Sequence, residues 1–508
     1  MNQPLLARLT PFLPYLAFAL LVLGGKLLLV AHYGSLTPMH DEWDGVGFRI
    51  FKPYVEGHLG WSQLLAPFNE HRIFTSRLYE LLLLWLDGGV WNPMLQMVGN
   101  AFWHVLALTG LLYGLRRACP EASRGGFVLL ALALLGAPLA VENTLVGFQS
   151  QFYFLMLFSF GCFWALTDAA ILSRRWWLGL LCGVLAVLSM ASGALTLLTV
   201  ALVLLLRRWR VGGGQGELVT AALLLLVAGA AIALTPVVHS YDPVRAHSPL
   251  EFIVAFLKVF SWPLSPGYLY GLRLPAPEIL FWPTGLVFLL LVQWPLLRFL
   301  VEQLRQPPAV KDASWLLFAV GLWLLGQLLA MSYSRASMPI TSRYVDMFSL
   351  GLLLNGLCLL RQTQKKAATG EAAPYLPFIQ IWLLVVLGGL AWYGSHIPPF
   401  LAQKLSFTPV AEANVRAYLQ THDYSILLNN EYPLIPYAEP GFLKQLLDDP
   451  SILSVLPPNL VPANAPREAA PVLWLLSNLE GLAIGVLVLG GVLAAASVVQ
   501  EAKRLKAQ

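Results

Sequence analysis

Residues 11–44 read PFLPYLAFALLVLGGKLLLVAHYGSLTPMHDEWD, an apolar run followed by a short loop that ends in acidic residues. The apolar part, residues 11–31, is long enough to cross a bilayer as one helix, and Lys26 is its only charge. It lacks a small-residue cleavage site at its end, so we expect a retained membrane helix. Acidic side chains beside a bilayer are costly and mark functional sites. The stretch therefore predicts a membrane protein with a site near residues 40–44.

The composition of the chain agrees with this class. Of the 508 residues, 57% are hydrophobic and only 12% are charged, which excludes an ordinary soluble globular protein. The net charge of +5 is small, and we expect no nucleic-acid partner. Four cysteines do not form a disulfide framework, because three of them fall inside apolar runs.

The placement of Lys and Arg predicts the topology. Seven basic groups, from Arg8 at the start to Lys506 at the end, can all lie in the cytoplasm at once. This solution requires that residues 44–87 do not cross the bilayer but lie along its outer surface. Both termini are then cytoplasmic, and a hairpin tip at residues 189–193 lies below the membrane surface, where protein or a water-filled cavity must surround it.

We predict an all-α polytopic membrane protein of about twelve transmembrane helices. Residues 1–394 form the transmembrane catalytic domain with outer juxtamembrane helices at about 44–87, residues 395–471 an extracytoplasmic loop or small lobe, and residues 472–508 the last transmembrane helix and cytoplasmic tail. The expected spans are 11–31, 94–115, 127–141, 151–172, 176–190, 193–206, 219–237, 279–297, 314–331, 344–360, 378–393 and 472–499.

The first outer loop carries a family resemblance. A span, a loop opening with Asp41-Glu42 and two surface helices before the second span resemble the GT-C superfamily of polytopic membrane glycosyltransferases. That superfamily includes protein O-mannosyltransferases, the aminoarabinose transferase of lipid A and arabinosyltransferases. The resemblance implies a GT-C-like bundle that passes a sugar from a polyprenyl-phosphate donor to an acceptor at the outer face. Asp41 matches the catalytic acid of the family, with Glu42 beside it.

One departure from the family leaves the sugar open. Aminoarabinose-type members carry Lys-Pro-Pro-Leu near the start of the second surface helix, where this chain has Asn69-Glu70-His71-Arg72. The resemblance therefore does not define the subfamily.

The chemistry points to the same residues. Inverting transfer needs a base for the acceptor hydroxyl, and two adjacent carboxylates raise the pKa of one of them, so we expect Asp41, or else Glu42, to be the base. Cationic donors should bind the leaving phosphate. The expected phosphate-binding residues are Arg72, His71, Arg335 and Arg343, and those with an acceptor-binding or structural role are Glu70, Asn69, Asp44 and Tyr344. A divalent metal at Asp41, Glu42, Glu70 and His71 is an open alternative.

Two other functions remain as alternatives. One is a flippase or transporter of lipid-linked sugars, which would place charges within the spans; few occur there apart from Lys26, Asp168 and Asp346. The other is an O-antigen ligase or polymerase, although residues 395–471 hold few arginines. The expected partners are a polyprenyl-phosphate sugar, a glycan, lipid or protein acceptor, and membrane lipids. By resemblance, the site faces the periplasm or exterior of a bacterial inner membrane and serves the cell envelope.

Overall fold

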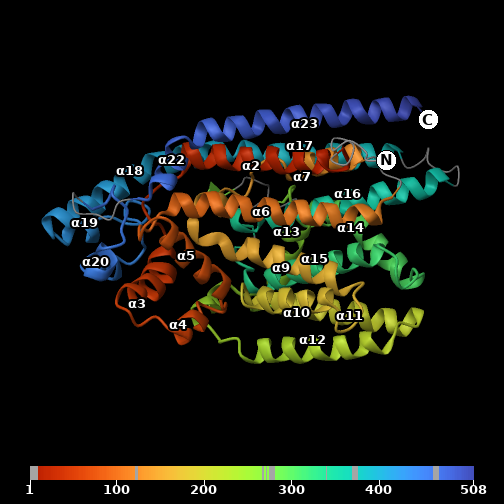
Figure 1. Cartoon of the computed structure of the whole chain (residues 1–508), viewed down its shortest axis with the longest axis horizontal. Coiled ribbons are helices and arrows are strands. Elements are labelled where there is room, and N and C mark those ends of the chain that lie inside the picture. The colour runs from red at the N-terminus through yellow and green to blue at the C-terminus, as the bar shows by residue number, and fades with distance from the viewer. Residues whose placement is uncertain are drawn as a thin grey trace, which may run out of the picture.

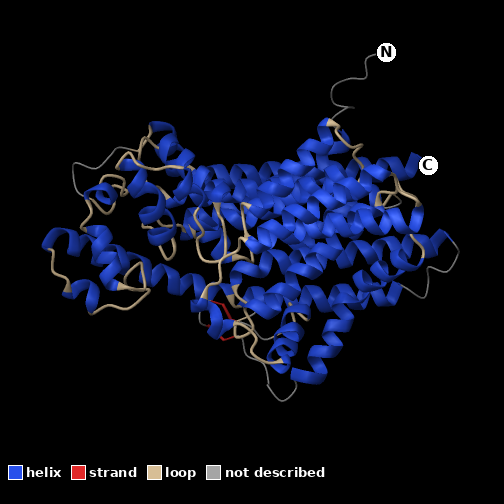
Figure 2. Ribbon diagram, turned by 90° about the horizontal axis from the view of Figure 1, so that it is seen from below, coloured by secondary structure: helices blue, strands red, loops and turns tan. Residues whose placement is uncertain are grey.

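The computed structural model describes residues 10–120, 124–265, 268–269, 272–273, 281–338, 340–368, 376–461 and 468–507. Helices form almost all of the regular structure (Figures 1 and 2). Two short antiparallel strands, β1 (Tyr268–Leu269) and β2 (Leu272–Arg273), are the exception.

Nine helical segments in the described part of the chain are long and apolar enough to cross a membrane. Each coincides with one of the expected spans, so the protein is a polytopic membrane protein. They are α2 (Leu13–Tyr33), α6 (Pro93–Leu115), α11 (Ala194–Val211), α12 (Gln215–Ala233), α14 (Phe281–Arg305), α15 (Ser314–Ser334), α16 (Val345–Ala368), α17 (Leu376–Ser395) with its continuation α18 (Ile397–Thr421), and α23 (Leu479–Ala507).

Shorter helices lie at the other three expected spans. These are α7 (Arg124–Leu135), α9 (Ser150–Leu166) and α10 (Arg174–Val187), with 12, 17 and 14 residues. Each falls short of the roughly 20 residues that a straight span needs. The arrangement of twelve spans therefore stays a prediction.

The long helices form a bundle with its axis horizontal in Figure 1. Contacts join α23 to α2, α2 to α6, α6 to α9 and α9 to α10, while α11 packs on both α12 and α15. The amino end of α2 and the carboxyl end of α23 lie at the same end of the bundle (Figure 1).

The opposite end carries short helices and the segment that follows α17 (Figure 1). From residue 42 to residue 87 the longest helix has 13 residues, which is too short to cross a bilayer. The short helices of this stretch are η2 (Glu42–Phe51), α3 (Lys52–Val55), α4 (Trp61–Leu65) and α5 (Phe74–Leu86). Later in the chain come α19 (Ser425–Leu428), α20 (Pro440–Leu447), α21 (Pro450–Leu453) and α22 (Ala470–Ser477).

A second hydrophobic core holds this end together. Buried side chains of η2, among them Trp43 and Ile50, pack in one cluster with Tyr418 of α18 and Leu443 of α20. Trp91 also belongs to it, and its backbone N–H donates to Val455 O at 2.7 Å. The segment after α17 thus shares a core with the loop that follows α2, although the sequence separates them by more than 350 residues. The predicted division at residue 395 falls where α17 meets α18, and the domain division stays a prediction.

The remaining elements are single turns and connecting helices. They are η1 (Thr10–Phe12), η3 (Arg116–Ala118), α8 (Val141–Leu145), η4 (Gly147–Gln149), η5 (Ala191–Gly193), η6 (His239–Val244), α13 (Pro249–Phe260) and η8 (Ser342–Tyr344).

Candidate active site

A cavity with an empty volume of about 990 Å³, partly open to solvent, lies where the loop after α2 meets the bundle. Its walls come from segments far apart in the sequence: the turn at residues 68–73, the start of α9, the end of α15, η8 with the start of α16, and the turn between α10 and α11. Seven of the ten sequence-predicted site residues are distributed around it, so it collects most of the expected chemistry. The predicted residues that line it are Asp41, Asn69, Glu70, His71, Arg335, Arg343 and Tyr344.

Asp41 reaches the cavity because a π-helix, η2, begins directly after it. Wide π-turns are frequent at functional sites. Two glycines allow this turn to approach its neighbours, since a Cβ on Gly45 would lie 2.6 Å from the Phe148 ring and one on Gly47 would lie 2.8 Å from the Trp91 ring. The sequence E-W-D-G-V-G therefore fixes the position of the loop as well as its charge.

The carboxylate of Asp41 makes no hydrogen bond or ion pair with any residue that the structure describes. Burial raises the pKa of Asp41; Arg343 lowers it, and the charges of Asp44 and Glu142 raise it further. A carboxylate that lacks partners and has a raised pKa is suited to accept a proton.

Glu42 does not line the cavity. Its Oε2 accepts a hydrogen bond from the backbone N–H of Met39 at 2.5 Å, and the side chain is 1% exposed. Burial raises the pKa of Glu42 to about 7, against the opposing effect of the Met39 and Gly147 N–H groups. The adjacent acids thus differ: Asp41 lines the cavity, and Glu42 holds the loop in shape.

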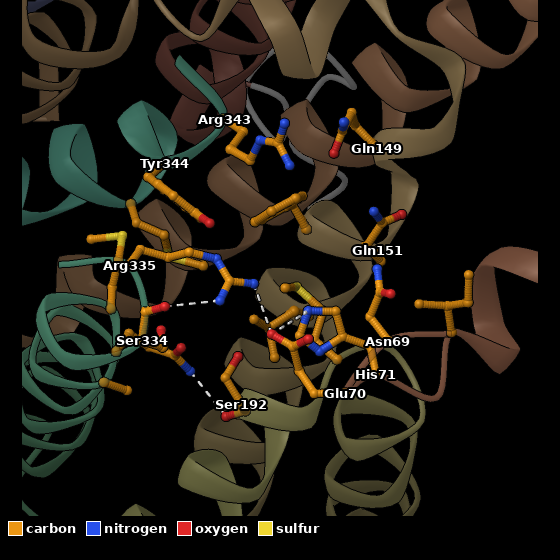
Figure 3. Close-up of a pocket in the computed structure, with 18 of the residues that line it drawn as sticks. Asn69, Glu70, His71, Gln149, Gln151, Ser192, Ser334, Arg335, Arg343 and Tyr344 are labelled. Carbon is orange, nitrogen blue, oxygen red and sulfur yellow. Dashed lines mark hydrogen bonds and ion pairs between the residues drawn. The ribbon is translucent and has the colours of Figure 1, made fainter. Parts of the chain in front are cut away.

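Glu70 and Arg335 form an ion pair across the cavity, with Oε1 and Nη2 2.8 Å apart (Figure 3). The Arg335 guanidinium also donates to Ser334 O at 2.9 Å and lies 4.4 Å from the centre of the Tyr241 ring. Burial raises the pKa of Glu70, but His71 and Arg335 outweigh it and hold the pKa below its usual value. Glu70 is therefore an anion that positions Arg335.

His71 is fixed by the turn between α10 and α11. Its Nδ1 accepts from the Ala191 N–H at 3.4 Å, so in the neutral ring Nε2 carries the hydrogen, 3.7 Å from Glu70 Oε1. Burial lowers the pKa of His71, although Glu70 opposes this. Met190 and Ser192 of the same turn line the cavity.

Arg343 is held by α8. Its Nη2 pairs with Glu142 Oε1 at 2.5 Å, and its backbone carbonyl accepts from Asn143 Nδ2 at 2.7 Å. The side chain remains 38% exposed at the cavity. Both arginines at the cavity thus form an ion pair with a carboxylate, which fixes the orientation of the guanidinium group.

Three predicted site residues do not line the cavity. Arg72 donates to Leu65 O at 2.7 Å and to Leu234 O at 3.0 Å, so it ties the surface turn to the end of α12. Asp44 pairs with Arg49 at 3.1 Å, and Glu42 is buried.

Several polar residues at the cavity were missed from the sequence: Gln149, Gln151, Ser192, Tyr241 and Gln327. Gln327 Nε2 donates to Ser192 O at 3.1 Å, which fixes the hairpin turn. The run Gln149-Ser150-Gln151 at the start of an expected span was the available signal, because amides at that position need partners.

A second polar cluster lies inside the bundle. Lys26 of α2 is 2% exposed, and its Nζ donates to Thr144 Oγ1 at 2.9 Å and to Tyr153 OH at 3.4 Å. His104 Nε2 lies 3.7 Å from Asp346 Oδ1, and Asn143 Nδ2 donates to Asp346 Oδ2 at 3.0 Å. Lys26 therefore faces the interior, and Asn143 joins this cluster to Arg343.

No group of three or more His, Cys, Asp and Glu side chains in the described part of the chain could hold a metal ion. Asp41, Glu42, Glu70 and His71 are thus not gathered into one ligand set.

Comparisons of the chain with protein-family models, with curated proteins and with solved structures found no match. The fold and the cavity define the class, a polytopic membrane protein with a charged cavity at the end of its bundle opposite the amino end of α2 and the carboxyl end of α23.

Proposed function

We propose that the protein is a membrane glycosyltransferase that transfers a sugar from a polyprenyl-phosphate donor to an acceptor at the outer face of the membrane, with inversion. The observation that carries the proposal is the Asp41 carboxylate, which has no partner among the described residues and lines a cavity with Arg335 and Arg343.

In this reaction Asp41 accepts the proton of the acceptor hydroxyl, while the oxygen of that hydroxyl attacks the anomeric carbon of the sugar. The bond between that carbon and the phosphate oxygen breaks, and the electron pair leaves with the phosphate. Arg343 and Arg335 stabilise the negative charge that develops there, because guanidinium groups match phosphate oxygens. Glu70 and Glu142 position the two arginines.

The cavity also has an apolar lining that suits a lipid chain. Phe152 and Leu155 of α9 and Leu328 and Met331 of α15 give it an apolar surface beside the charged groups. A prenyl phosphate has the same division into an apolar chain and an anionic head.

Asp41→Asn tests the proposal. The amide is nearly isosteric but accepts no proton, so transfer of labelled sugar from polyprenyl-phosphate sugars by the purified protein in lipid should fall by about 10²- to 10⁴-fold. Donor binding should be retained. Transfer at the wild-type rate would exclude Asp41 as the base.

A second candidate, a flippase of lipid-linked sugars, is favoured by the cluster of Lys26, His104 and Asp346, since charged residues inside a membrane bundle often serve transport. If the wild type moves donors between leaflets, transfers none, and is indifferent to Asp41→Asn, transport replaces the enzyme.

A further inference from the structure

Two glutamine side chains on the wall of the cavity form no hydrogen bond with any residue that the structure describes. Gln149 and Gln151 are 5% and 6% exposed and line the cavity. The Oε1 atom of each lacks a hydrogen-bond partner, and their amide nitrogens donate to no residue that the structure describes. Figure 3 shows both on one side of the cavity with Asn69, opposite Arg335 and Tyr344.

Other side-chain amides near the cavity differ from these two because their nitrogens donate to backbone carbonyls. Gln327 donates to Ser192 O at 3.1 Å, and Asn100 donates to Gly147 O at 2.8 Å. Those amides fix backbone turns. Buried polar groups in proteins are normally paired, so two unpaired amides at one wall indicate a ligand or water that pairs with them.

Asn69 completes this wall from another segment. Phe68 and His71 exchange backbone hydrogen bonds of 2.8 and 2.9 Å, which places Asn69 and Glu70 at the tip of a tight turn. Asn69 has a φ of 53°, a left-handed conformation that asparagine tolerates better than most residues. The turn sets the amide at the cavity.

We infer that Gln149, Gln151 and Asn69 bind the hydroxyl groups of the transferred sugar and select it. This inference rests on the proposed function. Each side-chain amide offers two donors and an acceptor oxygen, which match sugar hydroxyls that both donate and accept. The amide wall contacts the ring, and Arg335 and Arg343 contact the phosphate.

Donor analogues that each lack one hydroxyl provide the test. The wild type should use at least one of them about tenfold less efficiently than the parent sugar, because an amide loses its partner. Gln149→Leu and Gln151→Leu should lower kcat/KM for the parent by a similar factor and remove the discrimination against that analogue. Gln403→Leu, an exposed amide on α18 outside the cavity, is the matched control and should behave as wild type.

Binding of polyprenyl phosphate without sugar separates recognition of the sugar from recognition of the lipid phosphate. The glutamine variants should bind it as the wild type does, since the arginines are unchanged. If the wild type transfers sugar but tolerates every deoxy analogue, or if the leucine variants keep the wild-type preference, the amide wall does not select the sugar. The experiment with deoxy analogues uses the wild type alone, so its outcome does not depend on whether a variant folds. If the wild type transfers no sugar at all, the proposed function itself fails.

Discussion

Neighbouring residues with the same chemistry acquire different roles here because the backbone turns between them. Asp41 precedes the π-helix and reaches the cavity. Glu42 is the first residue of the π-helix, and its carboxylate accepts a hydrogen bond from the Met39 N–H at 2.5 Å. Sequence reasoning favoured Asp41 over Glu42 as the base but could not show how the backbone separates the two, since the separation depends on Gly45 and Gly47 packing against Phe148 and Trp91.

Glu42 makes the stability of the protein depend on pH. Burial raises its pKa from 4.5 to about 7, so the folded protein holds this proton more tightly than the unfolded chain. The stabilising contribution is complete below pH 4.5 and is lost as pH rises to about 7. The shift corresponds to about 3 kcal/mol.

Glu42→Gln keeps an acceptor for the Met39 N–H but does not ionise. Its melting temperature relative to wild type should therefore increase as pH rises from about 5 to about 8. Thermal unfolding of both proteins in the same lipid, at a series of pH values, measures this. Parallel curves for the two proteins would show that Glu42 does not ionise with the expected pKa.

At the scale of elements, the cluster around Lys26 joins five helical segments, one of which is α6 with His104. Lys26 lies on α2, Thr144 on α8, Tyr153 on α9 and Asp346 on α16. Asp346 lies within electrostatic range of Lys26. Removing one member of a buried charged group leaves the other uncompensated, at a cost of about 3–5 kcal/mol.

Lys26→Met should therefore lower the free energy of unfolding by about that amount, and Asp346→Asn should cost less in the Lys26→Met background than in wild type. A double-mutant cycle of thermal or denaturant stability measures the coupling. Additive effects of the two substitutions would mean that the charges do not interact.

The packing of α23 on α2 depends on a close approach at one glycine. A Cβ on Gly24 would lie 2.6 Å from Leu487 Cγ and 3.0 Å from Leu487 N, whereas a Cβ on Gly25 meets nothing within 4 Å. Small residues allow membrane helices to pack closely. Gly24→Ala should thus destabilise the protein by about 1–3 kcal/mol through overpacking.

Gly25→Ala, one residue away on the same helix, is the matched control. It should leave stability unchanged or raise it, because alanine favours a helix over glycine. Thermal stability of the two variants in detergent compares them directly. Equal losses would point to helix flexibility rather than contact with α23.

The elements show where sequence reasoning succeeds and fails. Long apolar runs predicted twelve spans, and in the described part of the chain nine of them are helices of sufficient length, because hydrophobicity over about 20 residues is a local property. The runs at α7 and α10 gave helices of 12 and 14 residues, since Gly136 and the turn at residues 188–193 end them. Gln149 and Gln151 were missed because their lack of partners depends on surrounding helices, which no sequence window contains.

For the whole molecule, the positions of the two ends and of the cavity decide which side of the membrane does the chemistry. The amino end of α2 and the carboxyl end of α23 lie together, at the end away from η2 and α20 (Figure 1). Basic groups such as Arg116-Arg117 and Lys503 belong to the same end as the termini in the predicted topology. This arrangement predicts cytoplasmic termini and an outward-facing cavity.

Single cysteines test this orientation in intact cells with a membrane-impermeant thiol reagent. Cys119, Cys162 and Cys358 are buried, and a background with all four native cysteines replaced by alanine removes the partly exposed Cys182. Asp423→Cys, on the exposed turn after α18, should react from outside, whereas Ala502→Cys, near the end of α23, should react only after the membrane is permeabilised. Labelling of both positions from outside would mean that the two ends of the bundle are not separated by the bilayer. The reverse pattern would place Asp41 on the cytoplasmic side, and the donor and acceptor would then have to be sought there.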